Sequence, residues 1–203
     1  MKVSRHVLCA IDDAELGQWD LALMHACIAI DGTARKLFPQ KTSNRDRYIT
    51  CIREYYWILE PMLFGINLEE TTFPNVPLKN NQKPDLAEII YEKFRCNDTH
   101  GEEIPKEFSL ILSHDNNARW VLANNFLQMP DRIVWALLGI AVFSHVNTDE
   151  KSNSDHYLFL RHPGTDLETK FRIAEWWGRE ENFRPIAVEH NTLRVKLENL
   201  NFN

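Results

Sequence analysis

Glycine is scarce in this 203-residue chain, which contains only seven. Neither G-x-G-x-x-G nor G-x-x-x-x-G-K occurs, so the two common glycine-rich loops that cradle nucleotide phosphates are excluded. The sequence also lacks G-x-S-x-G, the sharp turn that presents the nucleophile of many serine hydrolases. The sequence therefore predicts neither a cofactor site of these kinds nor serine hydrolase chemistry.

Cysteine and long apolar runs are also sparse. The four cysteines (Cys9, Cys27, Cys51 and Cys96) are scattered with no C-x-x-C pair, which predicts buried, reduced thiols in a cytosolic protein. The longest apolar run, residues 133–143, is too short to span a bilayer. Charged residues return at 12 and 13, so the apolar stretch near the start is too short for a signal peptide. We expect a cytoplasmic protein with no membrane association.

The chain has no overall excess of positive charge, because its formal net charge is −6, and this argues against indiscriminate nucleic-acid binding. One stretch differs from the rest: residues 32–53 carry six basic residues and one acid, a local +5 that leaves −11 for the remainder. This stretch is either two solvated helix ends with a loop or an anion-binding surface. On the second interpretation, the nucleic-acid contacts come from Arg35, Lys36, Lys41, Arg45 and Arg47.

Apolar residues at helical spacing predict four long helices. The first runs from about 15 to 38, where Pro39 stops it, and the residues before it are either a short helix or an extended arm. The second begins after Ser43, which can cap it, and ends or kinks at Pro61; the first two helices should pack as an antiparallel pair. The third begins at Asp85, and the fourth, apolar nearly all round, begins at Asp131 and should lie in the core.

The remaining segments predict short strands and loops. Residues 65–83 lose the periodicity and form a lid, a partner contact or a disordered loop. Strands over 108–113 and 119–123 should pair as a hairpin across H-D-N-N, and 156–161 reads as another strand. Residues 165–177 favour a helix ending at Gly178, with a strand as the alternative, and a closing hairpin should follow across Asn191 and Thr192. The predicted class is α+β, with a helical core over 1–146 containing the hairpin at about 108–123, and a β-rich extension over 147–203 packed on the same domain.

The third helix carries the most reactive group of residues. Asp85 and Glu88 form a capping box at its start, and Gly101 is a left-handed stop at its end. Beside that end, Arg95 and His100 stand with four residues between them. Arg95 offers a permanently charged, planar fork for anions, and His100 titrates near neutral pH. The plainer interpretation is an exposed helix arginine and a histidine that caps the helix C-terminus.

The segment R-C-N-D-T-H at 95–100 has the form R-x-x-x-x-H and resembles the signature of the HEPN superfamily (higher eukaryote and prokaryote nucleotide-binding domain). The segment A-C-I-A-I-D-G-T-A-R-K-L-F-P at 26–39 is similar to the opening helix of bacterial members. The resemblance covers roughly residues 15–146 and implies an up-down bundle of four to five helices. Many such proteins are metal-independent endoribonucleases that dimerise and pool two motifs in one cleft, often as toxins or in phage defence.

Carried over to this chain, the resemblance implies that Arg95 binds the scissile phosphate and that His100 transfers protons to or from the RNA. It also implies a supporting role for Asn97, which offers an amide near the place where such enzymes often carry Asn. Glu102 is a further supporting candidate, which would either face outward or pair with the basic stretch at 35–53. Because residues five apart point about 140° apart on an ideal α-helix, the two side chains need either a loosened helix or a homodimer to meet. An antitoxin or another partner protein in trans is a further expectation.

Three alternatives stay open beside the ribonuclease. The first is a non-catalytic HEPN-like module that binds RNA, a nucleotide or a partner protein, so whether the chain is an enzyme is left open. The second is a metal site, whose candidate ligands are His100, Glu102, Glu103, His114 and Asp115. Because these residues match no established ligand spacing, we expect no metal. The third alternative concerns the tryptophan pair, because Trp176 and Trp177 should be core or interface but could form a platform that stacks a base. The histidine within the first helix, His25, should be a hydrogen-bonded structural residue.

Overall fold

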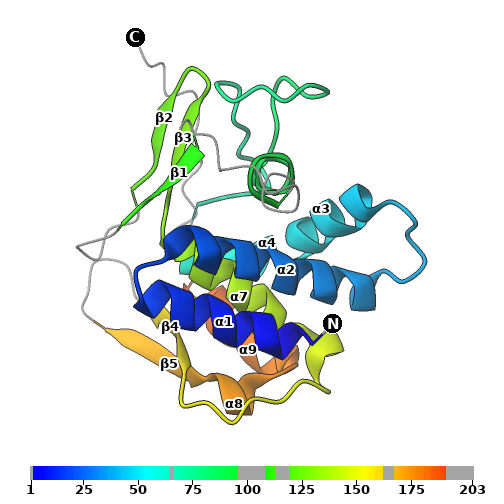
Figure 1. Cartoon of the computed structure of the whole chain (residues 1–203), viewed down its shortest axis with the longest axis vertical. Helices are drawn as coiled ribbons and strands as arrows, with labels where there is room; N and C mark the ends of the chain where they lie inside the picture. The colour runs from blue at the N-terminus through cyan, green and yellow to red at the C-terminus, as the bar shows by residue number, and fades with distance from the viewer. Residues whose placement is uncertain (1, 65, 96–107, 113–118, 162–166, 191–203) are drawn as a thin grey trace.

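The computed structural model describes residues 2–64, 66–95, 108–112, 119–161 and 167–190 (Figure 1). Helices pack around one central helix, and two small sheets lie at the periphery. This arrangement confirms the predicted α+β class. Every helix among the described residues is too short or too polar to cross a lipid bilayer.

The first two helices form an antiparallel pair along one side of the molecule (Figure 1). Helix α1 spans Val3–Glu15 and α2 spans Trp19–Leu37. The predicted helix from 15 to 38 therefore begins four residues late, because Gly17 takes a left-handed φ of 75° and turns the chain. The N-terminal residues left open by the sequence are helical, since Val3, Val7, Ala10 and Ile11 bury one face.

The second predicted helix divides into α3 (Asn44–Glu54) and α4 (Tyr56–Met62). Ser43 caps α3 as predicted, because its hydroxyl accepts a hydrogen bond from the Asp46 amide. The break falls at Tyr55, and Pro61 lies within the last turn of α4. The predicted antiparallel packing of the first and second helices corresponds to the contact of α2 with α3, whereas α1 is the closer neighbour of α2.

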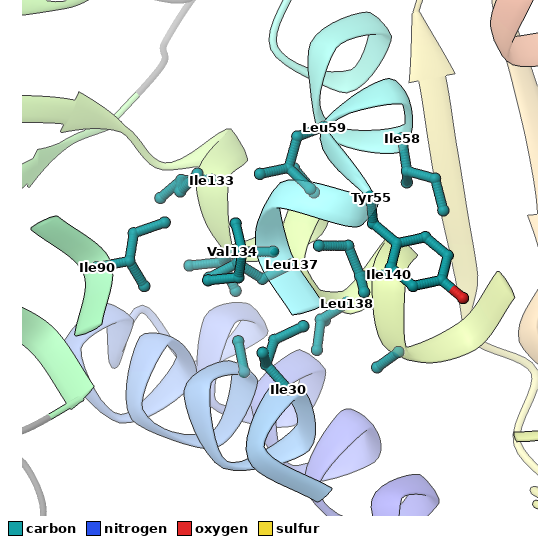
Figure 2. Packing of buried hydrophobic residues seen from close by; sticks show 14 of the residues in the cluster. Ile30, Tyr55, Ile58, Leu59, Ile90, Ile133, Val134, Leu137, Leu138 and Ile140 are labelled. Carbon is teal, nitrogen blue, oxygen red and sulfur yellow. The ribbon is translucent and has the colours of Figure 1, made fainter. Parts of the chain in front are cut away.

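Helix α7 (Arg132–Phe143) is the centre of the core, as its all-round apolar sequence predicted. Figure 2 shows its side chains between Ile30 of α2 and Ile58 and Leu59 of α4. Gly139 allows the close approach of α4, since a Cβ atom there would lie 2.7 Å from Met62 Sδ. The core therefore depends on the contacts of α7 with α2 and α4.

The described residues that connect α4 to the next helix form no helix or strand apart from an isolated bridge between Leu78 and Asn81. It is nevertheless packed against the core through Ile66, Leu68, Phe73 and Val76. The Glu60 carboxylate accepts a hydrogen bond from the Leu68 amide at 3.0 Å and holds the start of the segment. The described residues of this segment are therefore packed on the core, which argues against the disordered loop. The lid and the partner contact stay predictions.

The third predicted helix begins as expected and then widens. The capping box of Asp85 and Glu88 is present, with both reciprocal hydrogen bonds formed. Helix α5 covers Leu86–Ile89 and passes at once into a π-helix, η1, over Ile90–Arg95. The predicted stop at Gly101 lies outside the described residues.

The predicted hairpin between 108–113 and 119–123 is wrong. Strand β1 (Phe108–Ile111) pairs in parallel with β3 (Phe126–Pro130), and β2 (Val121–Ala123) pairs antiparallel with β3, so the order is β1-β3-β2. The hairpin joins β2 to β3 instead, across a two-residue turn in which Asn125 takes a positive φ of 55°. Residues 113–118, which contain the expected turn, lie outside the described residues.

The C-terminal part mixes strands and helices. Strand β4 (Tyr157–Arg161) is confirmed, and it pairs antiparallel with β5 (Glu168–Arg172), so the strand alternative was correct for the second segment. A short helix, α8 (Ile173–Trp176), ends before Gly178, whose φ is 71°. The first strand of the predicted closing hairpin is wrong, because α9 (Glu180–His190) occupies it and buries Phe183 and Ala187 at helical spacing. Residues 191–203 lie outside the described part.

An aromatic cluster fixes the C-terminal part onto the helical core. Phe143 of α7 stacks on Phe183 of α9, with ring centroids 3.8 Å apart and planes 9° apart. Phe171 of β5 and Trp176 of α8 meet the same ring edge-on. Trp177 is buried as well, so the tryptophan pair belongs to the core and not to an exposed platform.

Candidate functional site

Arg95, the predicted phosphate-binding residue, is the last residue of the π-helix η1. A π-turn closes i→i+5 hydrogen bonds, so residues five apart lie nearly above each other, whereas on an α-helix they would point about 140° apart. Ile90 is fully buried, and the side chain of Arg95, five residues later, is only 17% exposed and faces α2. The π-turn thus directs Arg95 inward rather than into solvent.

Asp31 of α2 brings Arg95 together with a second predicted residue, Arg35. Its Oδ2 lies 2.8 Å from Arg35 Nη2 and 3.9 Å from Arg95 Nη2. The Asp31 side chain is 11% exposed, so the carboxylate is largely buried. Its other oxygen, Oδ1, is buried and accepts no hydrogen bond from the described residues. Two guanidinium groups therefore share one buried carboxylate, and this group of three is called the Asp31 cluster below.

Aromatic and thiol groups line the inner side of the Asp31 cluster. The Arg95 guanidinium lies over the Tyr91 ring, 5.3 Å from its centroid, and the Tyr91 ring lies 5.5 Å from that of Tyr48. Burial raises the pKa values of Tyr48 and Cys51, so both groups stay protonated at neutral pH. The free thiols of Cys27 and Cys51 are buried as predicted, and that of Cys9 is partly exposed.

Three predicted members of the site cannot be placed beside Arg95. His100, Asn97 and Glu102 all belong to residues 96–107, which lie outside the described part, as does Cys96. The possible metal ligands Glu103, His114 and Asp115 also lie outside it. The pairing of Arg95 with His100 stays a prediction.

The basic stretch is largely neutralised by ion pairs. Lys36 Nζ lies 2.8 Å from Asp149 and 2.9 Å from Glu150, and Arg45 Nε lies 2.9 Å from Glu92. Arg53 Nε lies 2.6 Å from Asp85, so the capping box is also an ion-pair partner. These contacts favour the first of the two interpretations, solvated helix ends with a loop, because the +5 stretch faces acids that are distant in the sequence. Anion binding by this stretch stays a prediction.

Two basic residues keep their charge without a carboxylate. Among the described residues no acid lies within ion-pair distance of Lys41 or Arg47. Lys41 Nζ lies over the Phe38 ring at 5.6 Å, and Arg47 donates to the Lys41 carbonyl and to Asn44. Of the five predicted nucleic-acid contacts, these two are partly exposed and have no carboxylate partner among the described residues.

Comparison with known proteins gives the family. A family model described as Rv1289 matches residues 2–203. The chain belongs to the Rv1289 family. It is 32% identical over 189 residues to the uncharacterised proteins Mb1320 of Mycobacterium bovis and Rv1289 of Mycobacterium tuberculosis. The aligned stretch covers 91% of this chain and 85% of each relative. No solved structure matches it.

This member of the Rv1289 family has a second polar cluster, which the sequence did not predict, at the junction of α4, α7 and α9. The buried Glu180 carboxylate accepts hydrogen bonds at Oε2 from the Tyr55 hydroxyl and from His145 Nδ1, both at 2.8 Å. Arg184 Nη2 lies 3.0 Å from Oε1. Burial opposes ionisation, but the bonds from His145 and Tyr55 outweigh it and lower the pKa of Glu180.

The second cluster orients an imidazole for proton transfer. Because the Glu180 carboxylate fixes Nδ1–H of His145, Nε2 is the nitrogen that can accept a proton. The His145 side chain is 62% exposed, while Tyr55 and Ser144, which are hydrogen-bonded to each other at 2.8 Å, are buried. Figure 2 shows the ring of Tyr55 among the core side chains. The sequence offers one local signal for this cluster, the dipeptide Ser144–His145 after an apolar helix. The carboxylate partner Glu180 stands 35 residues after His145, so the pair could not be predicted from local order.

One group of three possible metal ligands exists among the described residues. It consists of Asp12 and Glu15 of α1 and His156, which precedes β4. His156 Nε2 lies 3.2 Å from Asp12 and its Nδ1 lies 3.7 Å from Glu15, so the two carboxylates pair with different ring nitrogens. Both carboxylates are more than half exposed, and the group is explained as a surface ion-pair cluster.

Proposed function

We propose that this protein binds and cleaves RNA without a metal ion, with Arg95 holding the scissile phosphate and His100 transferring protons. The observation that carries the proposal is the π-turn at the Asp31 cluster. It places Arg95 beside Arg35 at the end of the helix that leads into R-x-x-x-x-H. Short π-helical segments are frequent at functional sites. The resemblance to HEPN proteins supplies the reaction.

Asp31 has a definite role in this proposal. Its carboxylate orients Arg95 through a 3.9 Å contact, which is loose enough to exchange for a phosphate oxygen. The stronger 2.8 Å contact keeps Arg35 in place as a second cation. Asp31 is therefore a positioning residue, and Arg95 is the residue that contacts substrate.

The reaction that these groups support is an intramolecular transfer within RNA. A base takes the proton of the ribose 2′-hydroxyl, the 2′-oxygen attacks phosphorus, and the bond to the 5′-oxygen breaks as that oxygen takes up a proton. The products are a 2′,3′-cyclic phosphate and a 5′-hydroxyl end. One imidazole cannot be base and acid at once, so a homodimer with two copies of His100 in one groove fits the reaction. DNA lacks the nucleophile and is not cleaved. We propose that the protein acts in the cytoplasm as a toxin or defence effector, with an antitoxin in trans.

The test is cleavage of end-labelled RNA in EDTA by the wild type and by Arg95→Ala, Arg95→Lys and His100→Ala. We expect a loss of about 100-fold or more for His100→Ala, in line with the usual contribution of general acid–base catalysis. Arg95→Lys should recover only part of the activity, because an ammonium cannot form the bidentate contact. Asp31→Asn should lower activity less than Arg95→Ala.

A matched control separates this activity from a contaminating nuclease. Arg179 is an exposed arginine between α8 and α9, and no acid among the described residues forms an ion pair with it, so Arg179→Ala should cleave like the wild type. Cleavage that survives His100→Ala or Arg95→Ala would remove the ribonuclease proposal.

A second candidate is a non-catalytic module that binds RNA, a nucleotide or a partner protein. It is favoured by the ion pairs of Lys36, Arg45 and Arg53, which leave Lys41 and Arg47 as the basic residues of the stretch without a carboxylate partner among the described residues. RNA binding without cleavage, weakened by Arg47→Ala and Lys41→Ala, would select this candidate. The expected weakening is uniform across RNA sequences, because phosphate contacts carry no sequence information.

A further inference from the structure

Two histidines from different helices face each other across the seam between α1 and α2. His6 Nδ1 lies 3.0 Å from His25 Nδ1, and the ring centroids are 5.2 Å apart. Both rings are partly exposed, the His25 side chain by 23%. The sequence predicted a hydrogen-bonded structural role for His25, and in the fold its hydrogen-bond partner stands 19 positions earlier.

The two facing nitrogens leave no room for a second proton between the rings. Two ring nitrogens at hydrogen-bond distance can share only one proton between them, and a second proton would place two cations in contact. Burial, then His25 and Arg5, lower the pKa of His6. Neutral imidazoles are the form that binds metal ions, because a protonated nitrogen has no lone pair to donate.

The separation of the two nitrogens suits a shared metal ion. Transition-metal ions bind imidazole nitrogen at about 2.0–2.1 Å, so two ligating nitrogens stand about 2.9 Å apart at a right angle and about 3.4 Å apart at the tetrahedral angle. The observed 3.0 Å lies within that range. An ion can therefore enter with side-chain adjustments of a few tenths of an ångström.

Asp13 provides a second, independent observation. Its Oδ2 lies 3.7 Å from Nε2 of His25, the ring nitrogen that faces away from His6. Histidines that bind metals usually direct their second nitrogen at a carboxylate or carbonyl, which fixes the tautomer and raises the basicity of the ligating nitrogen. His25 resembles this arrangement at longer range, with Nδ1 toward His6 and with Nε2 at ion-pair distance, not hydrogen-bond distance, from Asp13.

We propose that His6 and His25 bind one borderline divalent transition-metal ion, such as Zn²⁺ or Ni²⁺, and that Asp13 is the positioning residue behind His25. Water fills the remaining coordination positions. The ion clips α1 to α2. Mg²⁺ and Ca²⁺ are excluded as occupants because they require oxygen ligands. The proposal is independent of RNA cleavage, which uses other residues and needs no metal.

The test uses tag-free, full-length protein with reduced thiols, titrated calorimetrically with ZnCl2 and with MgCl2. We expect one Zn²⁺ per chain and no Mg²⁺ binding. His6→Ala and His25→Ala should each weaken Zn²⁺ binding about tenfold or more, and Asp13→Asn about 10–100-fold. Zn²⁺ should raise the melting temperature of the wild type but not of His6→Ala, because it stabilises only the folded state that holds both ligands.

His156→Ala is the matched control, because it removes the surface cluster with Asp12 and Glu15 but leaves the histidine pair; it should bind Zn²⁺ like the wild type. Should a histidine variant fail to fold, Co²⁺ or Ni²⁺ titration of the wild type gives the same information. The paramagnetic ion should broaden the ring proton signals of His6 and His25 before those of other histidines. Zn²⁺ binding that is absent, that survives His6→Ala, or that is lost in His156→Ala or Cys9→Ser alone would overturn the proposal.

Discussion

Glu150 caps a helix that begins almost 150 residues earlier. Its carboxylate accepts hydrogen bonds from the amides of Val3 at 3.2 Å and Ser4 at 2.9 Å, and from Lys36 Nζ at 2.9 Å. The start of α1 has no side-chain cap of its own and no acid in its first turn. The free amides at this helix end therefore depend on Glu150.

The perturbation is Glu150→Gln, which keeps the shape and removes the charge. A hydrogen bond to a charged group contributes about 1.5–3 kcal/mol, and a negative charge at a helix N-terminus adds up to about 1 kcal/mol. Glutamine keeps one acceptor, so the expected loss of unfolding free energy is about 2–3 kcal/mol. For a chain of this size, that corresponds to a fall in melting temperature of about 4–12 °C.

The loss should depend on pH in a defined direction. Burial alone would raise the pKa of Glu150, but the bonds from Ser4, Lys36 and Val3 outweigh it and lower the pKa to about 2. A depressed pKa means that the carboxylate contributes its full stability above about pH 4.5 and loses it as the pH falls toward 2. The shift corresponds to about 3 kcal/mol at most, and solvent screening reduces that figure.

The assay is thermal unfolding of the wild type and Glu150→Gln, followed by circular dichroism between pH 7 and pH 2. Asp149→Asn is the control, since the Asp149 side chain is 72% exposed and forms an ion pair with Lys36 alone among the described residues, and it should lose about 0–1 kcal/mol. Equal losses for the two variants at pH 7, or a difference that stays constant down to pH 2, would refute the reasoning.

Two further predictions concern single positions. Gly178→Ala should lower the free energy of unfolding in urea by about 2–5 kcal/mol, because Ala is strained at a φ of 71° and its Cβ would lie 2.7 Å from the Thr148 backbone. The control Gly17→Ala, with a φ of 75° and open space around the Cβ, should lower it by only about 1–2 kcal/mol. Equal losses for the two variants would contradict the steric argument. Tyr55→Phe should lose about 1–3 kcal/mol in the same assay, because Glu180 and Ser144 lose a buried partner. Tyr157→Phe, at an exposed ring, should lose almost nothing, and similar values for the two tyrosines would argue against the buried network.

Local signals predicted the capped starts of α3 and α5 and the core helix correctly. The cap at Ser43, the capping box at Asp85 and the apolar sequence of α7 each depend on residues within a few positions of one another. Such short-range chemistry can be read directly from the order of residues. The helical start of the third predicted helix was therefore found, whereas its change into a π-helix at Ile90 was not, because no local pattern distinguishes it.

Contacts between distant segments could not be predicted. Strand β1 pairs in parallel with β3 and not with β2, the next strand along the chain. Helix α9 was predicted as a strand because Ile186 and Val188 suit alternation as well as a helix. The candidate site divides in the same way: Arg95 follows from its motif, but its carboxylate partner Asp31 lies 64 residues earlier. The His145–Glu180 pair and the His6–His25 pair likewise depend on tertiary packing.

The aromatic stack of Phe143 on Phe183 has a practical consequence for anyone who divides this chain into pieces. A fragment that ends at residue 146 would expose the face of α7 that Phe171, Trp176 and Phe183 cover, and a large exposed apolar patch promotes aggregation. A nick in the polar segment between Asn147 and His156 should instead leave two polypeptides that stay associated. Activity measurements on truncated forms would therefore report on damaged packing, so the uncut polypeptide is the proper material for both proposals.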